Sequence, residues 1–134
     1  MKVLADTSVW SLALRRKEPD KIVKKLTDLI FESMIVMIGP IRQELLSGIS
    51  ERTVFENLKS KLQSFDDLPI TTEDYETAAD FFNICRSKGV QGSHIDFLIL
   101  FFYKNIDIVV NIWYNRKGCY YAKDEIYDKW ETIF

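Results

Sequence analysis

The chain has 134 residues, of which 47% are apolar, and its formal net charge is −2. This length suits one domain that buries roughly two-thirds of the surface of the unfolded chain, and a second domain would be too small to hold a core, so we expect a single domain over residues 1–134. No apolar run reaches the roughly 18 residues that a membrane span needs, and the N-terminus lacks a signal-peptide layout. These features predict a cytoplasmic protein that makes no contact with a membrane.

The cysteines and the basic residues carry little functional information by themselves. Cys85 and Cys119 match no metal-ligand spacing, which predicts buried free thiols in a reducing compartment. The overall charge does not indicate nucleic-acid binding, although basic residues gather at positions 15–17 and 21–25. A solvated helix face is the simpler interpretation of these two stretches, and contact with phosphate is the alternative.

Strand and helix patterns alternate from the start of the chain. The apolar run at 2–5 predicts a buried strand that stops at Asp6. Thr7 and Ser8 follow at once and suit the N-cap of a helix over 9–16. A strand followed by an acid and a helix start places that acid at the carboxyl edge of a sheet, where ligands bind in open α/β sheets.

The rest of the chain continues the alternation. Helical spacing of apolar residues predicts helices over 21–31, 41–49 and 54–62, and strand-like runs occur at 34–38, 68–70 and 108–112. Such an order favours an α/β fold in three layers, with a central parallel sheet flanked by helices.

Capping-box patterns predict the starts of two further helices. Thr71 and Asp74 predict the start of a helix whose inward residues are Tyr75, Ala78, Ala79 and Phe82, ended by Gly89. Ser93 and Asp96 predict the start of a second helix, over residues 94–103. His94, the only histidine, is expected to be a polar cap or surface residue rather than a catalytic base.

Three carboxylates occupy positions where chemistry is plausible. Asp6 ends the first strand, Glu44 lies in the first turns of the helix after the second strand, and Asp96 is the only charge in the apolar run 95–103. Each has a structural alternative: Asp6 caps a helix, Glu44 favours the helix dipole, and Asp96 completes a capping box. If the three meet at the carboxyl edge of the sheet, their hard oxygen atoms suit Mg²⁺ or Mn²⁺ rather than Zn²⁺.

Three blocks of sequence, in order, resemble the conserved motifs of a known family. They are residues 3–10 (VLADTSVW), 38–48 (IGPIRQELLSG) and 91–97 (QGSHIDF). Together they resemble the PIN-domain ribonucleases of the VapC type, the toxins of type II toxin–antitoxin systems. The resemblance implies a PIN-like three-layer fold, a site that binds Mg²⁺ or Mn²⁺, and hydrolysis of phosphodiester bonds in an RNA substrate. It also implies a cognate antitoxin protein and a homodimer.

The resemblance assigns roles to particular residues of this chain. Asp6, Glu44 and Asp96 correspond to the acids that hold the metal ion and perform catalysis. Thr7 and Ser93 correspond to hydroxyl residues beside that site, in contact with the substrate or with the metal ligands.

The C-terminal part departs from the family pattern from about residue 109 onward. The family places another acid in a block that would fall at 112–116, and this chain has IWYNR there, without a carboxylate. Asn115 can bond to a metal-held water but brings no charge. The departure supports an alternative function, a catalytically impaired PIN module that binds an antitoxin or RNA without efficient cleavage.

Two other classes of α/β protein fit the sequence less well. A phosphatase of the haloacid-dehalogenase type needs a second Asp two residues after the first, and that position is Ser8. A response-regulator receiver needs paired acids at the end of the first strand, and only Asp6 is present.

Apolar contacts with an antitoxin or a second subunit have several candidate side chains. Most of these large apolar residues are expected to lie in the core rather than on the surface. The candidates are Trp10, Leu12, Leu14, Phe81 and Phe82.

Overall fold

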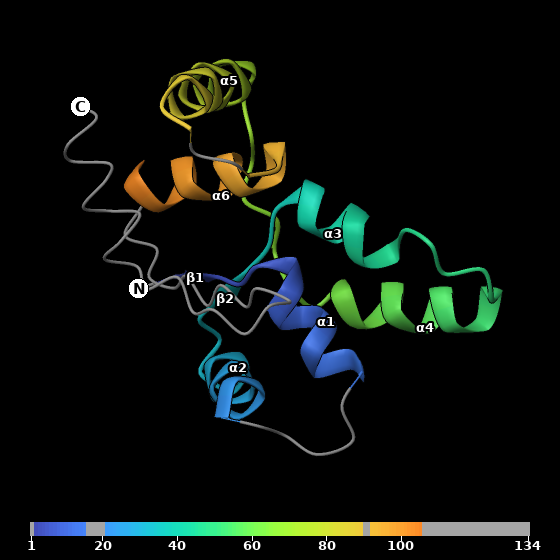
Figure 1. The fold of residues 1–134 in the computed structure, drawn as a ribbon. Coiled ribbons are helices and arrows are strands. Elements are labelled where there is room, and N and C mark those ends of the chain that lie inside the picture. The colour runs from blue at the N-terminus through green and yellow to red at the C-terminus, as the bar shows by residue number, and fades with distance from the viewer. Residues whose placement is uncertain (1, 16–20, 90–91, 106–134) are drawn as a thin grey trace.

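The computed structural model describes residues 2–15, 21–89 and 92–105, and Figure 1 shows the arrangement of their helices and strands. In chain order the elements are β1 (Val3–Leu4), α1 (Thr7–Arg15), α2 (Lys21–Phe31), β2 (Ile35–Val36), α3 (Gly39–Leu46), α4 (Arg52–Leu62), α5 (Thr72–Ser87) and α6 (His94–Asn105). None of the helices in these ranges is long and apolar enough to cross a membrane. The strand predicted at 108–112 lies outside the described residues.

The sheet is parallel, as predicted. β1 pairs with β2 in the register Val3 to Ile35 and Leu4 to Val36. An isolated parallel bridge between Met37 and Asp67 extends the sheet on the far side of β2. The strand predicted at 68–70 is not formed: residues 68–70 are irregular, and only the single bridge at Asp67 precedes them. Because α1 and α2 connect the paired strands, β1 and β2 form a crossover unit typical of α/β folds.

Helices cover both faces of this sheet. In Figure 1 the two strands lie between α2 and α6. One hydrophobic core joins all three layers, and its buried members include Val3 and Leu4 of β1, Leu26 and Leu29 of α2, Val36 of β2, and Leu98 and Ile99 of α6. The α/β fold with a parallel sheet flanked by helices is thus confirmed.

Four helices differ from prediction at their ends; α4 begins at Arg52 rather than at Val54, and α6 extends to Asn105 rather than to Tyr103. α1 begins at Thr7 rather than at Val9. The N-cap residue is Asp6, whose carboxylate accepts from the Ser8 amide, and not Thr7 or Ser8 as predicted. α3 ends at Leu46, so Ile49 is not part of it. Gly48 has a φ of +81°, a left-handed conformation that a helix cannot continue through and that glycine adopts without steric cost.

The inward face of α5 is rotated from the predicted one. Tyr75 is 50% exposed and Ala79 is also exposed, whereas Ala78, Phe81 and Cys85 are buried. These three buried residues follow the i, i+3, i+7 spacing of a single helix face. The prediction that placed Tyr75 and Ala79 inward was wrong, since only this narrower stripe faces the core.

Arg42 of α3 ties the helix to the chain that follows α4. Its Nε and Nη2 atoms donate to the carboxylate of Asp67, the shortest of these bonds being 2.7 Å. Its Nη1 donates to the carbonyl oxygen of Leu62 at 2.8 Å, and Nη2 donates to that of Phe65 at 2.9 Å. The Arg42 side chain is 22% exposed, so these bonds are partly shielded from water.

We expect Arg42→Ala to lower the free energy of unfolding by about 2 kcal/mol, because two backbone carbonyls and a carboxylate lose a charged donor. Urea denaturation followed by circular dichroism measures this change. Arg52→Ala is the matched control: Arg52 pairs with Glu56 but its side chain is 80% exposed, so its loss costs less than about 1 kcal/mol. Equal stability changes in the two variants would contradict the structural role of Arg42.

Candidate active site at the carboxyl edge of the sheet

The parallel sheet brings two sequence blocks to the same edge. Asp6 follows β1 after one residue, and α3 begins at Gly39, three residues after β2. Because parallel strands end at the same edge, the residues that follow β1 and β2 lie near each other there. α1 and α3 both start from this edge.

Asp6 caps α1. Its carboxylate Oδ2 accepts a hydrogen bond from the Ser8 amide at 3.0 Å and another from the Ser8 hydroxyl. The Asp6 carbonyl accepts from the amides of Val9 at 3.0 Å and Trp10 at 3.3 Å. Its other carboxylate oxygen, Oδ1, accepts no hydrogen bond from any residue that the structure describes. The capping interpretation of Asp6 is confirmed.

A hydrogen bond between two distant segments joins α1 to α3. The Thr7 hydroxyl donates to Oε2 of Glu44 at 2.6 Å, across 37 residues of chain. Thr7 is half-buried and Glu44 is exposed, so the carboxylate lies at the surface of this edge. The sequence placed Thr7 beside the acidic site, and the structure brings Thr7 together with Glu44.

Asp96 occupies the first turn of α6. Its Oδ2 accepts from the Ser93 amide at 2.7 Å, and its own amide donates to the Ser93 hydroxyl at 3.1 Å. This is the predicted capping box, so Ser93 acts on the helix end directly. Asp96 is half-buried rather than buried among apolar side chains, which removes part of the desolvation cost expected for it.

The structure therefore joins some of the predicted site residues and not others. Thr7 and Glu44 are in contact directly, and Asp6 precedes Thr7 in the chain. Asp96 is presented on a separate helix. In the ranges 2–15, 21–89 and 92–105 there is no group of three His, Cys, Asp or Glu side chains close enough to hold a metal ion. Asn115 lies outside the described residues.

The donor set nevertheless fits a hard divalent cation in its chemistry. Asp6, Glu44 and Asp96 offer carboxylate oxygens, which Mg²⁺ and Mn²⁺ prefer. In each of them a neighbouring hydroxyl or amide holds one oxygen in place. The three side chains thus have the chemistry of cation ligands, while the residues that the structure describes do not bring them together around one ion.

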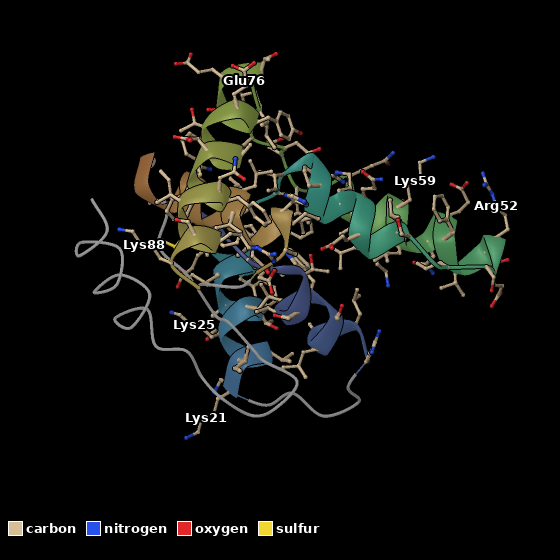
Figure 2. The ribbon with its side chains drawn as sticks, turned by 45° about the horizontal axis from the view of Figure 1, so that its top comes forward. Lys21, Lys25, Arg52, Lys59, Glu76 and Lys88 are labelled. Carbon is tan, nitrogen blue, oxygen red and sulfur yellow. The ribbon has the colours of Figure 1, made fainter. Side chains whose placement is uncertain are left out.

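The lysines of α2 lie away from the core. Lys21, Lys24 and Lys25 are exposed, and Figure 2 shows Lys21 and Lys25 extending from the helix away from the body of the molecule. This arrangement agrees with the solvated helix face expected for the basic stretch at 21–25.

Cys85 lies in a small aromatic cluster between α5 and α6. Its side chain is 4% exposed and packs with Phe81 and Phe97. Burial raises the pKa of the Cys85 thiol, and the nearby Lys88 ammonium lowers it in part. The prediction of a buried free thiol is confirmed for Cys85. Cys119 lies outside the described residues.

The parallel sheet has an acidic residue after its first strand and helix starts at that edge, which defines an α/β domain whose ligands are expected to bind there. A family model described as PIN domain matches residues 3–117. The chain belongs to the PIN-domain family, whose members are nucleases that typically depend on divalent metal ions. No curated protein matches the chain.

Two equivalent capping boxes allow the structural role of Ser93 to be measured. Thr71 makes the same box at the start of α5, where its hydroxyl accepts from the Asp74 amide at 3.2 Å. We expect Ser93→Ala and Thr71→Ala each to lower the free energy of unfolding by about 1 kcal/mol, because each removes an N-cap acceptor. Thermal and urea unfolding of both variants measures the changes. A Ser93→Ala protein as stable as the parent would show that the box does not hold α6 in place.

Proposed function

We propose that the protein is a ribonuclease that depends on Mg²⁺ or Mn²⁺ and acts as the toxin of a type II toxin–antitoxin system in the cytoplasm. The observation that carries the proposal is the hydrogen bond between Thr7 and Glu44. It joins the first and second VapC-like sequence blocks at the carboxyl edge of the sheet. The PIN-domain match, the order of the three blocks and the oxygen donors of Asp6 and Asp96 support it further.

The proposed roles follow from the chemistry of these side chains. Asp6, Glu44 and Asp96 hold the divalent ion, directly or through water. When bound, that ion would supply Lewis-acid chemistry, activating water and offsetting negative charge on the phosphodiester in the transition state. Thr7 keeps the Glu44 carboxylate turned toward the sheet edge, and Ser93 fixes the Asp96 carboxylate at the start of α6.

Asp6→Asn and Asp96→Asn are expected to reduce cleavage of total RNA by on the order of 100-fold or more while the fold remains intact. The amide retains an acceptor for the helix cap but removes the negative charge that a cation needs. Electrophoresis of RNA incubated with each variant and Mn²⁺, with circular dichroism as a folding check, measures this.

Asp74→Asn is the matched control for Asp96→Asn. Asp74 occupies the same capping-box position at the start of α5 but has no place in the acidic site. Its variant should cleave RNA at the rate of the parent. If Asp96→Asn and the parent cleaved equally, the catalytic assignment would be wrong.

A second candidate function is a PIN module that binds RNA or an antitoxin without efficient cleavage. Two observations favour it: residues 112–116 lack a carboxylate, and the described part of the chain holds no three-ligand metal group. Titration with Mn²⁺ in a calorimeter, paired with cleavage of total RNA with and without Mn²⁺, separates the two functions. For the nuclease we expect Mn²⁺ to bind with a dissociation constant in the micromolar-to-millimolar range. We also expect EDTA to stop RNA cleavage, because it removes the ion. RNA binding without either property would favour the inert module.

A cognate antitoxin and a homodimer belong to the same proposal. Most of the large apolar side chains considered for such contacts were expected to lie in the core. Trp10 is buried as expected, whereas Leu14 of α1 is 51% exposed. Exposed apolar area on α1 supports a contact with a protein partner. Light scattering of the purified chain tests the dimer. A small gene that overlaps the upstream end of this one would support the antitoxin.

A further inference from the structure

The ring of Phe82, near the end of α5, is the centre of a mixed aromatic and cationic cluster. The imidazole of His94 stacks on it, with ring centroids 4.5 Å apart and ring planes 27° apart. Phe97 meets the same ring edge-on, at 5.2 Å between centroids. The guanidinium carbon of Arg86 lies 5.8 Å from the Phe82 centroid. We call Phe82, Arg86, His94 and Phe97 the stacking platform.

The platform is fixed from the inside and open on the outside. Phe97 is 2% exposed, Phe82 is half-buried, and His94 and Arg86 are exposed. One face of the imidazole lies against Phe82, and His94 as a whole remains exposed. A flat surface that is held in place before a ligand arrives loses little side-chain entropy on binding.

The platform is built into the same helix start as Asp96. His94 and Asp96 both belong to the first turn of α6, which the Ser93 capping box holds. A Cβ added at Gly92 would lie 3.0 Å from Cε2 of Phe97 and 3.4 Å from Oδ2 of Asp96, so the chain entering α6 passes close to both. His94 and the Asp96 carboxylate therefore belong to one capped helix start.

We propose that His94, backed by Phe82, is a stacking site for a nucleobase of single-stranded RNA, with the Arg86 guanidinium on the same Phe82 ring as a nearby cation. Bases of single strands stack on aromatic side chains, histidine included, and on arginine planes, while arginine also contacts the phosphate next to the base. The inference rests on the proposed function, because it places the base beside the phosphate that the acidic site would receive. It adds a residue that selects unpaired RNA, since a base inside a duplex cannot reach a protein ring.

The single histidine of the chain makes a direct test possible. In an Asp6→Asn protein, which should bind RNA without cleaving it, the only imidazole C2–H proton signal in the NMR spectrum belongs to His94. Titration with a single-stranded oligoribonucleotide of about ten nucleotides should move this signal upfield, because a stacked base shields the ring protons. An abasic oligomer with the same phosphates should leave it in place.

Variants of the platform give the second measurement. In the same Asp6→Asn background, His94→Ala should weaken binding of the fluorescein-labelled oligomer by on the order of 10-fold in fluorescence anisotropy. His94→Phe should restore the affinity, because it keeps the ring and loses the titratable nitrogens. Rescue by Phe distinguishes stacking from a hydrogen bond or a charge.

The control comes from a similar pair elsewhere in the molecule. The guanidinium carbon of Arg52 lies 5.4 Å from the centroid of Phe55 on α4. Lys88 is the C-cap residue of α5, two positions after Arg86. In Figure 2 Arg52 and Lys88 lie on opposite sides of the molecule. Arg52→Ala should bind the oligomer as the Asp6→Asn parent does, whereas Arg86→Ala should bind it more weakly.

The outcomes separate this inference from the proposed function. If the Asp6→Asn protein bound RNA while His94→Ala, His94→Phe and the parent had equal affinities, the stacking site would be refuted and the nuclease proposal would stand. An unmoved His94 signal in a saturated complex would refute it as well. If the unmodified protein did not cleave RNA and the Asp6→Asn protein did not bind it, both proposals would fail together.

Discussion

The parallel pairing of β1 with β2 is the constraint on which the candidate site depends. The register pairs Val3 with Ile35 and Leu4 with Val36, and both strands therefore end at the same edge of the sheet. The hydrogen bond from Thr7 to Glu44 forms only because each residue follows its strand by a fixed number of positions. A slip of the register by one residue would exchange the side chains that β1 presents to the two helical layers and would separate this pair.

α3 is held from two sides, and this explains how Glu44 keeps its position on the surface. Residues two positions apart on a helix point in nearly opposite directions, since each residue advances about 100°. Arg42 therefore binds Asp67 on one side of α3 while Glu44 bonds to Thr7 on the other. Asp67 in turn belongs to the parallel bridge with Met37, so the sheet itself anchors the helix that carries the acid.

The sequence predicted the features that depend on neighbouring residues and missed those that depend on distant ones. Periodicity located α2 without error, and the two capping boxes were recognised from residues three positions apart. The clamp of Arg42 on Asp67 was not foreseen, because its partners lie 20 to 25 residues away and leave no periodic signal. The inward face of α5 was misjudged because an alanine or tyrosine at helical spacing does not reveal how wide the buried stripe is.

In the candidate site, too, the local features were predicted from the sequence and the long-range contacts were not. The acids Asp6 and Asp96 were identified from their local context and from the family resemblance, and each indeed caps a helix. Their contact with other elements is a long-range property. The bond of Thr7 to Glu44 spans 37 residues, and only the folded sheet brings the two together.

Capping and metal binding are compatible roles for the same carboxylate, and the helix starts explain why. Asp6 and Asp96 each give one oxygen to backbone amides at a helix N-terminus, where the helix dipole favours negative charge. These interactions hold each carboxylate in one orientation and favour its negative charge. Asp74 makes the same capping box at the start of α5 but falls in none of the three VapC-like sequence blocks, so we propose no catalytic function for it. Asp6 differs from Asp74 in its place: the helix that Asp6 caps starts at the carboxyl edge of the sheet, where ligands bind in open α/β folds.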